Sequence, residues 1–103
     1  MNVYLSPLAE FKLDLIYNYL ETEWSEKVKR DFQDKLFVSF KRIAQFPKSC
    51  PESQSNTGIF RCTLTKHNSY IYRVIQKEIE IITVFDNRQD PYKIQKEIDD
   101  YFA

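Results

Sequence analysis

Apolar residues recur at helical spacing through the first part of the chain. They lie four, three and four residues apart, at Ala9, Leu13, Ile16 and Leu20. Ser6-Pro7 marks a helix start, because a serine oxygen accepts from free amides and proline at the first helical position leaves no donor unused. The pattern predicts a short strand over residues 1–5 and a helix that ends near Glu23.

A second helical pattern follows a short break. Its apolar positions lie four, four, four and three residues apart, at Val28, Phe32, Leu36, Phe40 and Ile43. Ser25 can cap its start, and Phe46-Pro47 ends it, because proline cannot continue a helix. Two helices joined by so few residues are expected to lie antiparallel.

Residues 48–57 are mostly polar, and we predict that they form a surface loop. The hydrophobic period changes from 3.6 to 2 after the only glycine, Gly58, which follows this loop. Phe60, Cys62 and Leu64 then alternate with polar residues, which is typical of a strand with one buried face. We predict a hairpin loop at residues 66–68 and two further strands over residues 69–75 and 78–85, with a turn at residues 76–77.

The last of these strands is apolar on both sides, which predicts a central position. Strict alternation would place Ile79, Ile81, Thr83 and Phe85 on one face and Ile82 and Val84 on the other. Pro91 then starts a final helix with an apolar edge. The predicted fold is α+β, in the order β-α-α-β-β-β-α, with a two-helix hairpin packed on a small, largely antiparallel sheet.

Composition is consistent with one packed domain, residues 1–103. Hydrophobic residues make up 43% of the chain and aromatic residues 16%. Fifteen Lys and Arg balance fifteen Asp and Glu. The chain therefore lacks the basic excess that would indicate nucleic-acid binding. No apolar stretch approaches the roughly 20 residues that span a membrane, and no secretory signal pattern opens the chain. We therefore expect a cytoplasmic protein without membrane contact.

The sequence offers no site for a metal, nucleotide or organic cofactor. One glycine cannot form a glycine-rich phosphate loop, and one histidine with two cysteines cannot complete four zinc ligands. Cys50 and Cys62 are expected to be reduced, structural thiols. The alternative is a disulfide between them, which would require an oxidising compartment.

Three arginines of the second half are the main candidate site residues. Arg61 and Arg73 lie on neighbouring predicted strands and would share one face if the register allows, while Arg88 follows the last strand. Because burying an unpaired guanidinium is costly, the face that carries these arginines is expected to be open to solvent. Three guanidinium groups on an open face would suit phosphate or carboxylate recognition. In the alternative, Arg73 or Arg88 pairs with an acid and closes the fold; the nearby acids are Glu80, Asp86 and Asp90.

His67, the only histidine, lies in the predicted hairpin loop beside Lys66, where it could contact phosphate. The alternative is an exposed turn residue without chemistry.

Taken in order, these residues resemble the RelE/ParE toxins of bacterial type II toxin–antitoxin systems over nearly the whole chain. The resemblance rests on Ser6-Pro7-x-Ala9, Phe46-Pro47, Arg61, Tyr72-Arg73, and Ile79-x-Ile81 to Phe85 followed by Asp86-Asn87-Arg88-Gln89-Asp90-Pro91. It implies a growth-inhibiting toxin that a cognate antitoxin holds inactive. The antitoxin's disordered segment would fold as it wraps the toxin, which suits a hydrophobic groove on the helix pair or the sheet.

The resemblance implies two candidate activities. RelE-like members cut messenger RNA on the ribosome, and ParE-like members inhibit DNA gyrase without cleaving nucleic acid. RNA cleavage needs an acid–base group, and many RNA-cleaving members carry a His or Tyr near the end of the last strand. This sequence has Phe85-Asp86 there, and Tyr92 lies further on, in the final helix. That departure and the neutral net charge favour a ParE-like inhibitor; the alternative is a RelE-like ribosome-dependent mRNA endoribonuclease.

For an inhibitor, the expected target contacts are Arg61, Arg73, Arg88, Lys66 and Asp86. For a nuclease, the candidate catalytic residues are Arg61, Arg73, Arg88 and His67. The expected partners are the cognate antitoxin, in a hetero-oligomer, and DNA gyrase or, in the alternative, the ribosome and mRNA; no cofactor is expected.

Overall fold

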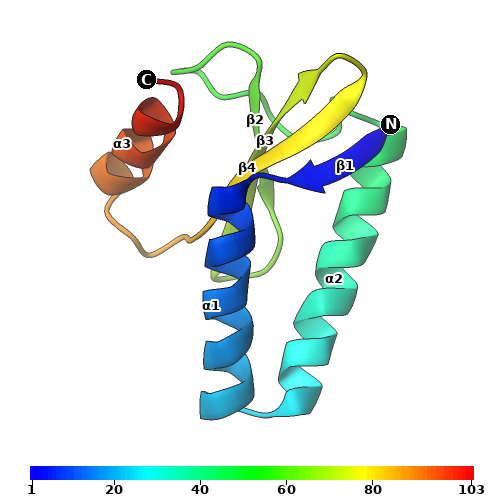
Figure 1. Cartoon of the computed structure of the whole chain (residues 1–103), viewed down its shortest axis with the longest axis vertical. Coiled ribbons are helices and arrows are strands. Elements are labelled where there is room, and N and C mark those ends of the chain that lie inside the picture. Colours follow the sequence, from blue (N-terminus) through cyan, green and yellow to red (C-terminus); the bar gives the residue numbers. More distant parts are fainter.

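Three helices and a four-stranded sheet form the chain in the order that the sequence predicts, and the α+β fold class is confirmed (Figure 1). The computed structural model describes all residues from Met1 to Ala103. The elements are β1 (Asn2–Leu5), α1 (Pro7–Glu23), α2 (Glu26–Gln45), β2 (Ile59–Thr63), β3 (Asn68–Ile75), β4 (Glu78–Asp86) and α3 (Pro91–Tyr101). None of the helices is long and apolar enough to cross a membrane.

Serine caps begin both long helices, as the sequence predicts. The Ser6 Oγ accepts a hydrogen bond from the Ala9 amide at 3.0 Å and donates to the Ile82 carbonyl at 2.6 Å. Ser6 therefore caps α1 and fixes its start to β4. The Ser25 Oγ accepts from the Val28 amide at 3.1 Å, and the two helices run antiparallel as a hairpin (Figure 1).

The strands lie in the order β1-β4-β3-β2, so the prediction that β4 is an inner strand is confirmed. β1 pairs with β4 in parallel, whereas β4 with β3 and β3 with β2 are antiparallel. The predicted turn between β3 and β4 consists of Gln76 and Lys77, which have φ values of 50° and 66°. Two successive residues with positive φ are typical of the two-residue hairpin turns whose twist matches that of the flanking strands.

A β-bulge in β4 changes which side chains share a face. Ile71 pairs with Thr83 and Tyr72 pairs with Ile81, so Ile82 is an extra residue on β4. The predicted strict alternation therefore holds as far as Ile82 and is wrong from Thr83 onward. Val84 joins Ile81 in the core under the helical hairpin, whereas Thr83 and Phe85 lie on the opposite face, toward α3.

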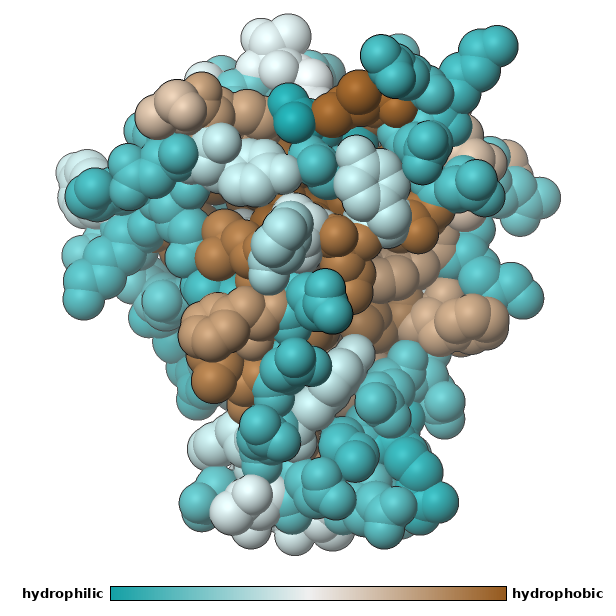
Figure 2. Space-filling model, in the orientation of Figure 1, coloured by the Kyte–Doolittle hydropathy of each residue, from teal (hydrophilic) through white to brown (hydrophobic).

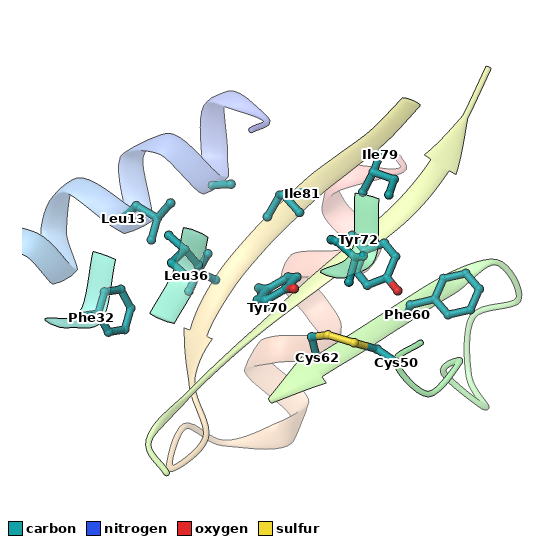
Figure 3. Close-up of a cluster of buried hydrophobic side chains, with 13 residues drawn as sticks. Leu13, Phe32, Leu36, Cys50, Phe60, Cys62, Tyr70, Tyr72, Ile79 and Ile81 are labelled. Atoms are coloured by element: carbon teal, nitrogen blue, oxygen red, sulfur yellow. A yellow bond between two sulfur atoms is a disulfide. The ribbon is translucent and has the colours of Figure 1, made fainter. Parts of the chain in front are cut away.

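The sheet buries a core on each face. The larger core lies between the sheet and the helical hairpin, and Figure 3 shows ten of its side chains by name, including Leu13, Phe32, Leu36, Tyr70, Tyr72 and Ile81. The hydroxyl of Tyr72 donates to the Pro47 carbonyl at 2.7 Å, and that of Tyr70 lies 2.7 Å from the Ser39 Oγ. The smaller core joins α3 to the other face through Ile59, Ile71, Ile82, Phe85 and Ile98.

Cys50 and Cys62 form a disulfide, with their Cα atoms 5.3 Å apart, so the prediction of two reduced thiols is wrong (Figure 3). The cause is the path of the loop before β2. The Arg61 amide donates to the Pro51 carbonyl at 2.9 Å, which holds the loop along the outer edge of β2. Hydrophobic periodicity cannot reveal a loop that packs back on a strand edge.

Candidate functional site

Arg73 is held inside the fold by an acid and two aromatic rings. Its Nε donates to the Glu80 Oε1 at 2.8 Å, and its guanidinium carbon lies 4.6 Å from the ring centre of Phe102 and 5.9 Å from that of Tyr101. Glu80 is only 8% exposed. The guanidinium thus neutralises a buried carboxylate beneath the end of α3, and the structure shows the pairing alternative for Arg73.

Arg88 is paired with Asp86 at the end of β4. Its Nη2 and Nε lie 2.6 and 2.9 Å from the two carboxylate oxygens, and its backbone amide donates to the same carboxylate at 2.8 Å. Hydrogen bonds from the Arg88 side chain are the main cause that lowers the pKa of Asp86 to about 2. The same contact raises the pKa of Arg88. Asp90, the third acid considered from the sequence, caps α3 by accepting from the Tyr92 amide.

Arg61 alone among the three candidate arginines makes no ion pair. Its guanidinium carbon lies 4.8 Å from the ring centre of Phe85, and its Nη2 lies 3.4 Å from the Asn87 Oδ1. It lines a pocket of about 240 Å³ between the sheet and α3. This guanidinium remains available for an external anion.

The three guanidinium groups do not converge on one site. Arg61 pairs in register with Ile71, and Arg73 pairs with Ile59, so Arg61 and Arg73 do share the face of the sheet that carries α3. Arg73 reaches Glu80 near the start of β4, whereas Arg61 reaches Phe85 near its end. Arg88 turns to the other face, toward α1.

A cleft of about 460 Å³ between α1 and the end of β4 brings other candidate residues together. Asp86, Arg88 and His67 line it from one side, and Leu15, Tyr19 and Trp24 line it from the hairpin. Lys66 lies beside this cleft, where its carbonyl accepts from the Asn87 side chain at 3.2 Å. We call this groove the α1 cleft.

An exposed apolar stripe continues from the α1 cleft along α1. Phe11, Leu15 and Tyr19 are 59%, 51% and 57% exposed, and Trp24 at the end of α1 is 68% exposed. Figure 2 shows apolar surface near the centre of this view, over the upper part of the helical hairpin, and mainly hydrophilic or near-neutral surface at its lower end. Phe11, Leu15 and Tyr19 lie four residues apart in the sequence, beside the buried stripe, and this signal could have identified a second apolar face.

Sequence reasoning missed Asn87 and the polar lining of the Arg61 pocket. Asn87 accepts from the Ser69 Oγ at 2.6 Å, and its amide nitrogen donates to Lys66. Ser53, Ser55 and Gln95 come to the same pocket from the loop before β2 and from α3. No spacing in the sequence joins these segments, because the loop path and the α3 packing bring them together.

Several solved structures share this fold, two of which are described next. A chain of the "Chromosomal ParDE TA system from P. aeruginosa" matches with a TM-score of 0.70 and 20% identity, covering 84% of this chain and 95% of that one. A chain of the "YoeB-YefM complex from Staphylococcus aureus" matches with a TM-score of 0.55 and 17% identity, covering 82% and 94%. No protein-family model and no curated protein matches the chain. The likenesses establish a fold shared with chains of these two complexes.

Proposed function

We propose that this chain is the toxin of a type II toxin–antitoxin module, and that it acts as a ParE-like inhibitor of DNA gyrase. The observation that carries the proposal is the match to a chain of the ParDE system over 84% of this chain and 95% of the other. The motifs from Ser6-Pro7 to the segment after β4 point to the same family on independent grounds. Fold alone does not fix activity, so the site chemistry decides between binding and cleavage.

The site geometry favours binding over RNA cleavage. A nuclease needs an acid–base group and cations that are free to hold a phosphate. Asp86 has a pKa near 2 and accepts hydrogen bonds on both oxygens from Arg88, so it is a weak base. Arg73 already neutralises Glu80, and His67 lines the α1 cleft rather than the Arg61 pocket. These residues do not form one acid–base and phosphate-binding arrangement.

The second candidate is a RelE-like mRNA endoribonuclease. The likeness to a chain of the YoeB-YefM complex, at a TM-score of 0.55, is the observation that favours it. In that case the candidate catalytic residues would have to be rearranged around RNA on the ribosome. These residues are Arg61, Arg73, Arg88 and His67.

The cognate antitoxin is proposed to cover the exposed stripe of α1 and the α1 cleft in a hetero-oligomer. A segment that folds on binding would bury Phe11, Leu15, Tyr19 and Trp24, which now lie at the surface. We propose Arg61, Arg88, Lys66 and Asp86 as target contacts, because they surround the end of β4, with Arg61 on the α3 face and Asp86 and Arg88 in the α1 cleft. Arg73 could contribute only by leaving Glu80. A cytoplasmic location remains a prediction, and the disulfide between Cys50 and Cys62 does not favour it, because such bonds are rare in reducing compartments.

Induced expression in bacteria without the antitoxin tests the proposal. We expect growth arrest with loss of plasmid supercoiling and intact message, and rescue when the cognate antitoxin is expressed as well. Arg61→Ala is the target-site variant, and Arg30→Ala, an exposed arginine of α2 without an ion pair, is its matched control. Rapid codon-positioned cleavage of message with normal supercoiling would establish the nuclease alternative instead. Normal growth at full expression would refute both.

A further inference from the structure

The Arg61 pocket is a built recess whose only charged lining group is a guanidinium. It is formed by β2, β3, the end of β4 and the turn after it, the loop before β2, and α3, and it has a volume of about 240 Å³. No acidic side chain lines it, although the chain as a whole carries fifteen acidic residues. The pocket therefore has the electrostatic character of a site for one negative charge.

Arg61 is oriented before any ligand arrives. Its guanidinium stacks on Phe85 at 4.8 Å and contacts the Asn87 Oδ1 at 3.4 Å. Asn87 is itself fixed, because its Oδ1 accepts from Ser69 at 2.6 Å and its amide nitrogen donates to the Lys66 carbonyl at 3.2 Å. One long contact to a neutral amide leaves most of the five guanidinium hydrogens for a ligand, and preorganisation lowers the entropy cost of binding it.

The walls of the pocket are apolar on one side and polar on the other. Aliphatic side chains come from the sheet and α3, at Ile59, Ile71, Ile94 and Ile98, and hydroxyl and amide groups come from Ser53, Ser55 and Gln95. The Gln95 amide nitrogen already donates to Asn56 and Asp99, at 2.9 Å each. Such a recess suits a group whose charged end meets Arg61 while a small apolar stem contacts the isoleucines.

We propose that this pocket binds a carboxylate on an apolar stem, supplied by a protein partner as an acidic or C-terminal residue beside an aliphatic side chain. A single guanidinium fork matches the single charge and two oxygens of a carboxylate. A phosphate group at neutral pH carries a charge of about −1.5 to −2, and a pocket with one cation would leave much of that charge uncompensated. The inference rests on the proposed function only in treating Arg61 as a partner contact.

Binding of N-acetyl-leucine to the purified chain tests this proposal, because that probe carries one carboxylate on an aliphatic stem. Chemical shifts of the Arg61 side chain and of the amides of Ile59, Ile71 and Ile98 would be followed by NMR. N-acetyl-leucinamide is the neutral control with the same stem, and inorganic phosphate is the control for anion type. Arg61→Gln and Arg61→Lys are the pocket variants, and Arg30→Gln is the matched surface variant.

We expect saturable shifts with N-acetyl-leucine. The neutral amide should bind the unaltered chain at least about tenfold more weakly, and N-acetyl-leucine should bind Arg61→Gln at least about tenfold more weakly, because a hydrogen-bonded charge is lost in each case. Arg61→Lys should also bind more weakly, since a point charge cannot reproduce the fork, and Arg30→Gln should bind like the unaltered chain. Equal binding of acid and amide, equal binding to Arg61→Gln, tighter binding of phosphate, or no saturable shift at millimolar probe would overturn the proposal. Growth inhibition is not read in this experiment, so its failure and that of the proposed function are separable.

Discussion

Replacing Arg73 by alanine should destabilise the fold far more than the same change at Arg61. The ion pair between Arg73 and Glu80 is 2.8 Å long, with Arg73 and Glu80 side chains 32% and 10% exposed. Breaking a fully buried pair costs about 3–5 kcal/mol, mainly because the remaining charge stays buried. Arg73 is partly exposed and the Tyr4 hydroxyl still lies 3.4 Å from Glu80, so we expect about 2 kcal/mol for the ion pair.

The loss of the aromatic contacts adds to this cost. The guanidinium of Arg73 lies 4.6 Å from the ring centre of Phe102, and such contacts contribute about 0.5–1 kcal/mol at partly exposed sites. The total of roughly 3 kcal/mol corresponds to a fall in Tm of roughly 10–20 °C for a domain of this size. Arg61→Ala leaves no buried acid unpaired, and we expect it to cost less than about 1 kcal/mol.

Urea unfolding followed by circular dichroism would measure these differences in the free energy of unfolding. Glu80→Gln in the Arg73→Ala background should recover part of the loss, because a neutral amide is less costly to leave without a cation. The reasoning would be refuted if Arg73→Ala and Arg61→Ala cost the same, or if Glu80→Gln destabilised the Arg73→Ala variant further. In that event, the Arg73–Glu80 pair would not be a stabilising part of the fold.

Three further predictions concern a disulfide, a turn and an acid. Cys50 and Cys62 are 12 residues apart, and reduction of the bond between them should lower the free energy of unfolding by about 2–3 kcal/mol. Thermal melts with and without dithiothreitol should therefore differ, and the double alanine variant should remove that difference. Lys77→Gly should raise the free energy of unfolding by about 1 kcal/mol in urea titrations, because φ at this position is 66°; a loss of stability would contradict the turn assignment. Because its pKa falls from 3.8 in the unfolded chain to about 2 in the fold, Asp86 should contribute stability that is complete above pH 3.8 and lost as pH falls through about 2. Its side chain is 35% exposed, so solvent screening reduces the contribution to about 0.5–1 kcal/mol, and Asp86→Asn should flatten this part of an acid titration.

The elements of the fold were predictable because their signals are local. The caps at Ser6 and Ser25, the proline stop after Phe46 and the change to period 2 after Gly58 each depend on a few neighbouring residues, and the structure confirms them. Hydrophobic burial then fixes the faces of β2, where Phe60 and Cys62 enter the larger core as the alternation predicts.

The pairing of charges and thiols was not predictable, because it depends on side chains from distant segments. The sequence left open whether Arg73 and Arg88 pair with acids, and the packing of α3 and the turn after β4 decide that both do. The disulfide required the loop before β2 to return to the strand edge. The pocket around Arg61 combines six segments, so no single pattern could indicate it.

The extra residue Ile82 links the fold to Arg61, the one candidate site arginine that makes no ion pair. With strict alternation, Asp86 would share the α3 face of the sheet with Arg61, and a carboxylate there could pair with that guanidinium. The bulge shifts the later residues by one, so Phe85 lies on the α3 face beneath Arg61 and Asp86 lies on the hairpin side with Arg88. Arg61 thereby has an aromatic ring beneath it and no acid in its pocket, which is the condition for binding an anion from another molecule.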